Sequence, residues 1–478
     1  MIDFTNVIVA LFFTIIIVIF TYYKKRTYFP GPEGNFLCGS EVELNSPKVH
    51  LHWVYWMKTY GLIFRVWSWW NPIIYVCDAK VITAIIEQKL PKHGGFYEGF
   101  RPLSGLGLFS QLKESQWKHD RKIISEALRD KNSQVEIFQK HLNNVSAFLK
   151  NNDHREVDFT KLSVLFTLDI IGEVLFDCDF KSLERFNEKL ELNCPIYVHL
   201  QNILPELLKC GVSPWRIKIP IFSSTRNMLR HIKELQRYAN EMIKLRTELE
   251  SKKECLLDTL ISEIGTTQSL ESVRDHIITL AVAGCDPTAN SIVFAMYELM
   301  NNPECQEKIC KELEANNYIS CSNPSEMRNI LHRSKSPILN SFVNEVLRMH
   351  GPGFGTIRTC PFKMSFTDSN GIGIEFNPGD PLLLWNYPTH HSEKYYAAAD
   401  KFIPERFIGE VLIEHGSYFP FSFGERRCLG ENIALLEIKL VLAHFICHYN
   451  FQTKDTLDQQ TCFTLAPHGQ FRIIFTSK

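Results

Sequence analysis

The chain has 478 residues, and its 52 lysines and arginines nearly balance 53 aspartates and glutamates, which gives a formal net charge of −1 and an isoelectric point near 7.0. A nucleic-acid-binding protein typically carries a basic excess, so this balance does not indicate that class. The length alone would allow several domains. The 14 cysteines include no Cys-x-x-Cys pair and no regular spacing, so all but one are expected to be reduced thiols.

The first element in chain order is an uncharged apolar run, residues 4–23, whose length suits a membrane-spanning helix of about 20 residues. A basic cluster at residues 24–26 follows at once, and such a flank marks the cytosolic side. A cleaved signal peptide would need a basic start and a small-residue cleavage site, and neither is present. We therefore expect residues 1–26 to be an N-terminal membrane anchor with its basic stop, and residues 27–478 to be a single catalytic domain.

A β-hairpin is predicted after the anchor. The β-branched and aromatic runs 62–67 and 73–77 flank Asn71-Pro72, which is expected to form the turn. An aromatic patch against a membrane is a compatible interpretation of the tryptophans in this segment, Trp67, Trp69 and Trp70.

The middle of the chain is predicted to be mainly helical. From residue 134 to 314 the pattern is that of long helices, with one of its breaks expected across residues 205–220. No internal repeat or low-complexity linker interrupts it, which favours one large core. A helix predicted over 273–300 is apolar almost all round between residues 277 and 283, as is typical of a helix buried within a domain.

The most specific chemical signal is the decapeptide Phe-Ser-Phe-Gly-Glu-Arg-Arg-Cys-Leu-Gly, from Phe421 to Gly430. A helix is predicted to follow it, and the N–H groups at a helix start favour the ionised thiolate of Cys428. Gly424 allows the loop to fold back, and Gly430 allows a close approach to a flat macrocycle. Arg426 can neutralise a carboxylate on that macrocycle. A thiolate in such a loop can hold haem iron.

The decapeptide matches Phe-x-x-Gly-x-Arg-x-Cys-x-Gly at every fixed position, so the chain resembles the cytochrome P450 haem-thiolate monooxygenases. It looks most like the microsomal type, in the clan of insect enzymes and fatty-acid ω-hydroxylases. The resemblance implies a mainly α prism fold with a small β-lobe (α+β), and haem b with Cys428 as its metal ligand. It also implies NADPH used through a membrane-bound NADPH–cytochrome reductase, with cytochrome b5 as a further electron donor, and a single-pass location in the endoplasmic reticulum membrane.

Further segments are similar to the family's haem contacts. Trp117 and Arg121 share one face of a predicted helix, where an indole N–H and a guanidinium can bind a propionate, although such a pair alone is more often a packing pair. Arg358, after a glycine-rich segment, resembles another propionate-binding arginine. A basic rim that either receives an acidic reductase or is simply solvated is formed by Lys118, Lys122 and Arg427.

Within the predicted central helix, the segment from Ala283 to Thr288 resembles the family's oxygen-activation motif, Ala/Gly-Gly-x-Asp/Glu-Thr-Thr. Gly284 is expected to leave space for dioxygen, and Asp286 to pass protons inward through water. Pro287 stands where the family usually has a threonine whose hydroxyl group stabilises the bound oxygen. Proline has neither a hydroxyl group nor an N–H. We therefore expect Thr288 or an ordered water to take over proton delivery.

A third group of residues is expected to be structural. Glu345 and Arg348 share a face of a predicted helix, where an isolated pair would usually be a solvated ion pair of little energetic value. Together with Arg406 they resemble the family's Glu-x-x-Arg plus arginine triad, which locks the core beneath the haem.

The reaction implied by the resemblance inserts one atom of O2 into a small hydrophobic substrate, such as a lipid, a hormone-like molecule or a xenobiotic. The family covers its substrate pocket with the loop equivalent to residues 94–109, and a turn near residues 460–463 is expected to touch substrate. Two alternatives stay open. One is a haem-thiolate isomerase or dehydratase that uses a peroxide without NADPH, and the other is a non-catalytic haem- or ligand-binding protein.

Overall fold

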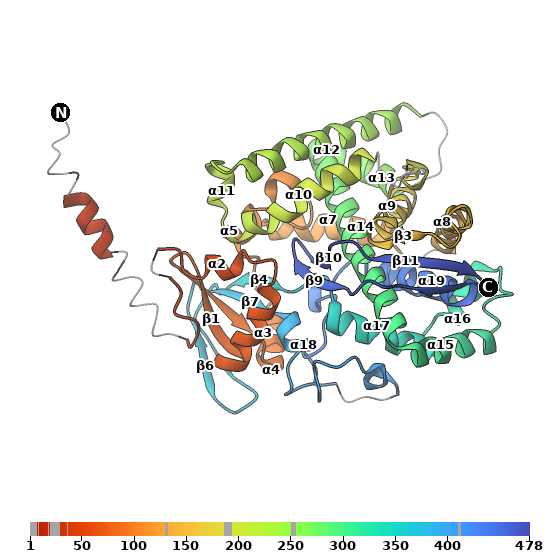
Figure 1. Cartoon of the computed structure of the whole chain (residues 1–478). Coiled ribbons are helices and arrows are strands. Elements are labelled where there is room, and N and C mark those ends of the chain that lie inside the picture. The colour runs from red at the N-terminus through yellow and green to blue at the C-terminus, as the bar shows by residue number, and fades with distance from the viewer. Residues whose placement is uncertain are drawn as a thin grey trace. The chain divides into compact units, whose positions relative to one another are not determined.

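The computed structural model describes residues 7, 9–17, 19, 29–35, 37–129, 132–185, 194–249, 255–409 and 413–478 (Figure 1). The chain folds into two compact units, each assembled from separate stretches of sequence. The first unit comprises Met1–His93, Gly355–Tyr395 and Glu414–Tyr418, and the second comprises Gly94–Phe354, Tyr396–Ile413 and Phe419–Lys478.

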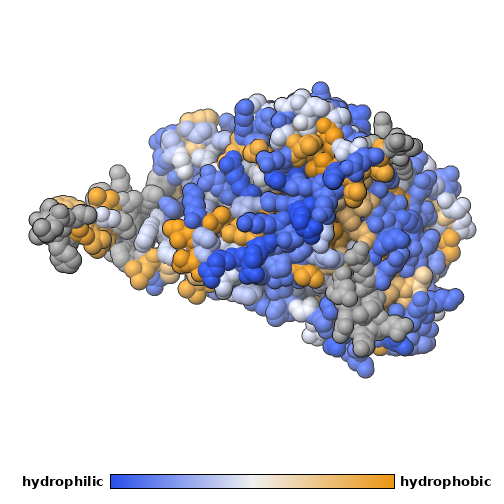
Figure 2. Space-filling view, turned by 90° about the horizontal axis from the view of Figure 1, so that it is seen from above, coloured by the Kyte–Doolittle hydropathy of each residue, from blue (hydrophilic) through white to orange (hydrophobic). Residues whose placement is uncertain are grey.

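Only part of the predicted anchor lies among the described residues. Positions 7, 9–17 and 19 are helical, and Figure 2 shows hydrophobic side chains on this N-terminal helix. Those side chains are largely exposed; Phe12, for example, is 61% exposed. The basic cluster at 24–26 lies outside the described residues. Within the described part of the chain, one helix, Leu270–Asn301, is long and apolar enough to cross a membrane, and it is mostly buried inside the protein.

The first unit is built on a four-stranded sheet with the strand order β1-β2-β7-β4. β1 and β2 are antiparallel, β7 runs parallel to β2, and β4 runs antiparallel to β7, while β5 and β6 form a separate hairpin. The elements of this unit are α2 (Glu41–Leu44), α3 (Val49–Tyr60), β1 (Ile63–Ser68), β2 (Asn71–Val76), α4 (Ala79–Glu87), β4 (Thr356–Thr359), β5 (Met364–Thr367), β6 (Gly373–Phe376), β7 (Pro381–Leu384) and α18 (Asn386–His390).

The β1–β2 hairpin is confirmed, but the predicted turn is wrong by two residues. Asn71-Pro72 are the first residues of β2, and the turn consists of Trp69 and Trp70. Trp69 has a φ of +54°. The tight turns of hairpins require such a positive φ, which residues other than glycine rarely adopt. Trp67 is fully buried in the unit, so it cannot contribute to a membrane-facing patch.

The second unit is mainly helical and carries a three-stranded sheet, β3-β11-β8, and the hairpin β9–β10. Its elements are α5 (Gly94–Glu98), α6 (Arg101–Ser104), α7 (Glu114–Ala127), α8 (Asn132–Asn151), β3 (Glu156–Asp158), α9 (Phe159–Phe176), η1 (Leu183–Arg185), α10 (Pro195–Val212), α11 (Trp215–Lys218), α12 (Ser223–Glu248), α13 (Leu256–Thr259), η2 (Leu260–Gly265), α14 (Leu270–Asn301), α15 (Pro303–Ala315), α16 (Pro324–Ile330), α17 (Pro337–His350), η3 (Pro404–Phe407), η4 (Gly424–Arg426), α19 (Glu431–His448), β8 (Tyr449–Gln452), β9 (Asp458–Thr461), β10 (Leu465–His468) and β11 (Arg472–Ser477).

The central helix of the second unit is α14, as predicted, and Figure 1 shows it running between the other helices. It packs against α9, α12, α17 and α19. Its first half, up to Ala289, belongs to one apolar cluster with α7, α10 and α12, and its second half, from Ile292, belongs to another with α8, α15 and α17. Because it joins two cores, α14 buries apolar side chains along most of its length. It continues through Pro287 without a break.

The break predicted across residues 205–220 begins too early. Pro205 lies inside α10, which continues to Val212, and the connection to α12 contains only the short helix α11. A proline in a helix interior removes one hydrogen bond and is usually avoided. Here Ile203 and Leu207 are both fully buried, and this packing outweighs the local cost.

The structure corrects the role expected for Gly284. A Cβ atom at this position would lie 2.4 Å from Cδ1 and 2.5 Å from Cγ1 of Ile171, a side chain of α9. The space assigned to dioxygen on that side is therefore filled by protein. The exposed residue of the motif is its neighbour, Ala283. Gly284 lets α14 and α9 approach each other.

The substitution Gly284→Ala should lower the free energy of unfolding by about 1–3 kcal/mol, because the added methyl group overlaps Ile171. In an Ile171→Ala background the same change should cost much less, since the clashing atoms are gone. Denaturant unfolding of the two single variants and the double variant measures this coupling. Equal costs in both backgrounds would show that Gly284 does not pack against Ile171.

Candidate functional site

The loop that carries Cys428 is closed by its own backbone. The N–H of Cys428 donates to the carbonyl oxygen of Phe421 at 2.9 Å, and Phe421 packs against the hydrophobic core. Ser422 and Gly424 have positive φ angles of +59° and +71°. The reversal at Gly424 favours a residue without a Cβ atom. The loop therefore presents Cys428 directly before the first turn of α19.

Cys428 is the only one of the 14 cysteines, all of which lie in the described part of the chain, whose side chain is exposed; none of them forms a disulfide. Desolvation by the surrounding protein and the charge of Glu431 raise the pKa of its thiol, while the backbone N–H groups of Gly430 and Glu431 and the charge of Arg121 partly oppose that rise. A Cβ atom at Gly430 would meet no atom within 4 Å. An accessible thiol at a helix start, beside open space, fits the requirements of an iron ligand.

Two arginines meet at one indole ring between α7 and the Cys428 loop. The guanidinium carbons of Arg426 and Arg121 lie 3.9 and 5.4 Å from the centre of the Trp117 ring. Arg121 also donates from Nη2 to the carbonyl oxygen of Arg427 at 2.5 Å. Arg121 and Arg426, both predicted to bind carboxylates of the macrocycle, thus meet at the ring of Trp117.

Glu114 is a site residue that the sequence analysis missed. It forms an ion pair with Arg426 and lies 3.7 Å from Lys118. An acidic residue in the first turn of a helix interacts favourably with the helix dipole. The sequence therefore accounts for an acid at position 114, but it does not reveal that Arg426 is the partner of that acid. Lys118 also lies 4.0 Å from Glu425, and Arg427 is paired with Glu431. The predicted basic rim is therefore partly neutralised by acids.

Asp286, on α14, is held by a side chain from the turn between β9 and β10. The hydroxyl group of Thr464 donates to Oδ2 of Asp286 at 2.5 Å, and the amide nitrogen of Asn290 donates to the same hydroxyl oxygen at 3.0 Å. Burial raises the pKa of Asp286 to about 6, and the hydrogen bonds from Thr464 and Asn290 oppose that rise. Asn290 could have been found from its spacing of four from Asp286. Thr464 gave no sequence signal.

The motif residue Thr288 lies apart from this group. It is only 4% exposed, and it follows Asp286 by two helical positions, about 200° round the helix axis. Asn290 follows Asp286 by four positions and returns to the same face. The structure therefore brings Asp286 together with Asn290 and Thr464, and not with Thr288.

The predicted triad is assembled in the interior of the second unit. Arg348 donates to Glu345 from Nε and Nη2 at 2.7 and 2.8 Å, and Nε of Arg406 lies 3.3 Å from Glu345 Oε1. Glu345 and Arg348 are completely buried. Arg348 also donates to the carbonyl oxygens of Ala399 and Lys401 at 2.8 and 3.0 Å. The pair thus fixes the segment that leads into η3.

Arg358, the remaining predicted haem contact, belongs to the first unit. It lies on β4, is 8% exposed, and donates from Nη1 to the carbonyl oxygen of Ile357 at 3.2 Å. Its relation to Cys428, in the second unit, stays a prediction.

An aromatic cluster lines the second unit near Asp286. Neighbouring ring centres lie 5.1–5.9 Å apart, and the rings come from α5, the residue before α6, the loop after α6 and the β9–β10 turn. Phe463, in this turn, directly precedes Thr464. The members are Phe96, Tyr97, Phe100, Phe109 and Phe463.

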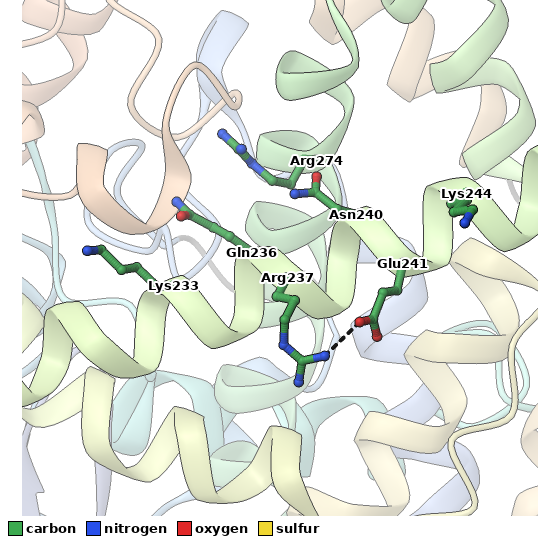
Figure 3. A pocket seen from close by; sticks show the side chains of 7 residues that line it. All are labelled: Lys233, Gln236, Arg237, Asn240, Glu241, Lys244 and Arg274. Carbon is green, nitrogen blue, oxygen red and sulfur yellow. Dashed lines mark hydrogen bonds and ion pairs between the residues drawn. The ribbon is translucent and has the colours of Figure 1, made fainter.

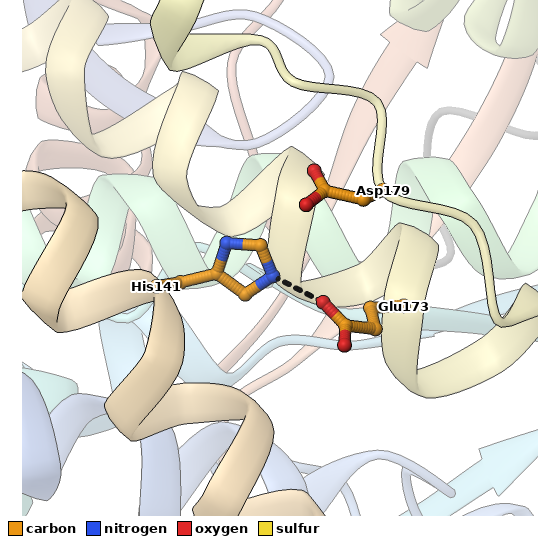
Figure 4. A group of neighbouring side chains, drawn as sticks. All are labelled: His141, Glu173 and Asp179. Atoms are coloured by element: carbon orange, nitrogen blue, oxygen red, sulfur yellow. Dashed lines mark hydrogen bonds and ion pairs between the residues drawn. The ribbon is translucent and has the colours of Figure 1, made fainter.

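Two other groups of polar side chains in the second unit resemble binding sites. His141, Glu173 and Asp179 lie together (Figure 4), but the ammonium group of Lys140 binds both carboxylates, at 2.7 and 3.0 Å. Both carboxylates therefore have a cationic partner already, and the group is an ion-pair network. A shallow groove beside α12 is lined by long polar and charged side chains, with Arg274 contributed by α14 (Figure 3), and Arg237 is paired with Glu241. It is a solvated helix face and contains none of the predicted site residues.

The raised pKa of Asp286 predicts how stability depends on pH. Between the ordinary aspartate value of 3.8 and about 6, the folded protein binds a proton that the unfolded chain releases. The free energy of unfolding should therefore fall as the pH rises through this window. Asp286→Asn should remove this dependence and raise stability above pH 6 by up to about 3 kcal/mol. Thermal melts at pH 4 and pH 7.5 test this, and an equal effect of the substitution at both pH values would contradict it.

Arg348→Ala should lower the free energy of unfolding by about 3–5 kcal/mol, because the Glu345 carboxylate would stay buried without its main partner. We also expect the purified variant to lack haem. Arg237→Ala is the matched control, since that arginine forms two ion pairs at the surface and its loss should leave stability and haem content unchanged. Normal haem incorporation by the Arg348 variant would contradict the structural role.

Comparison with known proteins agrees with this geometry. A family model described as "Cytochrome P450" matches residues 29–471. Cytochrome P450 52A6 of Candida tropicalis is 27% identical over 77% of this chain and 75% of its own length. Cytochrome P450 4e2 of Drosophila melanogaster is 27% identical over 92% and 86%, and cytochrome P450 3A7 of Homo sapiens is 23% identical over 90% and 86%. With a match over most of its length and a mainly helical fold with small sheets, the chain belongs to the cytochrome P450 family of monooxygenases.

Proposed function

We propose that this protein inserts one atom of O2 into a small hydrophobic substrate, with electrons from NADPH delivered by a membrane-bound reductase and with cytochrome b5 as a further electron donor. The observation that carries the proposal is the accessible thiol of Cys428 at the start of α19, beside Arg121, Arg426 and Trp117. Family membership supports the reaction class. The hydrophobic substrate is supported by the aromatic cluster of the same unit.

The residues present fit haem b. Cys428 would ligate the iron, Gly424 and Gly430 would let its loop pass close to the ring, and Phe421 would hold the loop against the core. Propionates would be bound by Trp117, Arg121, Arg358 and Arg426. When bound, the haem supplies dioxygen activation at thiolate-ligated iron.

The protein's own contribution is to position groups, exclude water and deliver protons. Arg348, Glu345 and Arg406 would keep the interior segment rigid, and the aromatic rings would keep bulk water out. With a pKa of about 6, Asp286 has both its protonated and its ionised form available near neutral pH, which suits a group that passes protons on.

We further propose that residues 1–26 anchor the protein in the endoplasmic reticulum membrane and that residues 27–478 act as one cytosolic catalytic domain. The exposed apolar side chains of the described part of the N-terminal helix support an anchor. Among the basic residues proposed to face a reductase, Lys122 is exposed, whereas Lys118 and Arg427 have acidic partners. Exposed charges of this kind would mainly influence the rate of encounter with the reductase.

The decisive experiment uses the purified full-length chain with reductase, NADPH and a panel of fatty acids and hydrophobic xenobiotics. NADPH oxidation, oxygenated product and hydrogen peroxide are followed together. We expect at least one substrate to give product in proportion to the NADPH consumed. Cys428→Ser should reduce product formation to the background of the reductase alone, because it removes the thiolate ligand.

Other outcomes would replace the proposal. Conversion of hydroperoxides without NADPH, combined with no oxygenated product in its presence, would identify an isomerase or dehydratase; Pro287 is the residue that favours this second candidate. Spectral changes on ligand binding without turnover under either condition would identify a binding protein.

A further inference from the structure

We propose that Thr464 and Asn290 are positioning residues for proton delivery by Asp286, and that the Thr464 hydroxyl group takes the place of the hydroxyl group that Pro287 removes from α14. The inference rests on the proposed monooxygenase function. It assigns a role to two residues that lie outside the oxygen-activation motif, one of them 178 positions away from Asp286.

The direction of the hydrogen bonds supports this assignment. A hydroxyl group has one proton to donate and two lone pairs, whereas the nitrogen of an asparagine amide only donates. Because Asn290 donates to the Thr464 oxygen, the single Thr464 proton is directed to Asp286 when that carboxylate is ionised. Once Asp286 is protonated, its own O–H can donate to the Thr464 oxygen, and the Thr464 O–H can then donate a hydrogen bond to a different acceptor. Protonation of the acid therefore reorients the alcohol.

Burial protects the hydrogen bonds of Thr464 and Asn290 from exchange with water. Thr464 and Asn290 are 7% and 5% exposed, so bulk water does not compete freely for their hydrogen bonds. The alternative alcohol, Thr288, lies on a different face of α14 from Asp286. Pro287 cannot contribute a side-chain proton.

Two thiols and a carboxyl are the other titratable groups to weigh beside Asp286 among the described residues. Cys285 on α14, Cys462 on the β9–β10 turn and Glu437 on α19 are the groups to consider. Burial raises the pKa of the Cys285 thiol and raises that of Cys462 to about 11, so both stay neutral at physiological pH. Burial also raises the pKa of Glu437 well above its ordinary value. A titration near pH 6 can be assigned to Asp286 by its loss in the Asp286→Asn variant.

The first test is an infrared pH titration of the carboxyl band in the haem-loaded full-length protein. Thr464→Val keeps the side-chain shape but removes the hydrogen bond that stabilises the carboxylate. We expect this to move the midpoint up by about one pH unit. Thr464→Ser should keep the original midpoint, and Asn290→Ala should shift it upward by less. Should Thr464→Val fail to fold, the titration midpoints of Thr464→Ser and Asn290→Ala can still be compared with that of the wild type.

The second test follows the fate of NADPH in the reductase assay. Thr464→Val should raise the fraction of NADPH that ends as hydrogen peroxide several-fold, and Thr464→Ser should restore the wild-type fraction. An unchanged midpoint together with an unchanged peroxide fraction in Thr464→Val would overturn the proposal, and so would a larger effect of Thr288→Val on either quantity. If the protein is not a monooxygenase, wild type and variants alike give no product, while the infrared titration still decides whether Thr464 controls Asp286.

Discussion

The constraint on which the second unit depends is the burial of most of α14. Two apolar clusters meet along its length, so most of the helix is surrounded by other elements. Polar groups on such a helix need partners from outside it, because a buried carboxylate without hydrogen bonds is costly. Asp286 finds its partner on a turn of the C-terminal hairpin. The packing of the central helix and the chemistry of its acid thus depend on the same neighbours.

Charged groups in the interior follow the same logic. Glu345 and Arg348 are fully buried, and each has several hydrogen-bond partners, including backbone groups of the segment before η3. At the Cys428 loop, Trp117 contacts both arginines, and Glu114 pairs with one of them. In each place an arginine is held by a flat aromatic ring or by a carboxylate that accepts two hydrogen bonds. Such a partner fixes the orientation of the planar guanidinium group, which a contact with a single point charge would not do.

The sequence predicted those parts of the site whose residues lie close together in the chain. The Cys428 decapeptide and the Glu345–Arg348 pair lie within one turn or one helix, so their spacing determined which residues came together. Thr464 could not be found in this way, because its pairing with Asp286 arises only from tertiary packing.

Local rules also failed where packing overrode them. The propensity of Asn71-Pro72 for turns placed the hairpin turn two residues too late, since the pairing of β1 with β2 puts Trp69 and Trp70 in the turn. Pro205 did not end its helix, since buried neighbours stabilise it. At Gly284, the absence of a side chain indicated open space, whereas the structure fills that space with Ile171.

The division of the chain has a consequence for its biosynthesis. In the first unit, β2 pairs with β7, and the whole of Gly94–Phe354 separates these two strands in sequence. On the ribosome, the N-terminal part of this sheet emerges early and has to remain incomplete until β7 has been made. Unpaired strands with exposed apolar side chains are prone to aggregate. A nascent chain of this protein therefore needs protection during most of its translation, and a stall before β7 would leave the β1–β2 hairpin without the strand that pairs with β2.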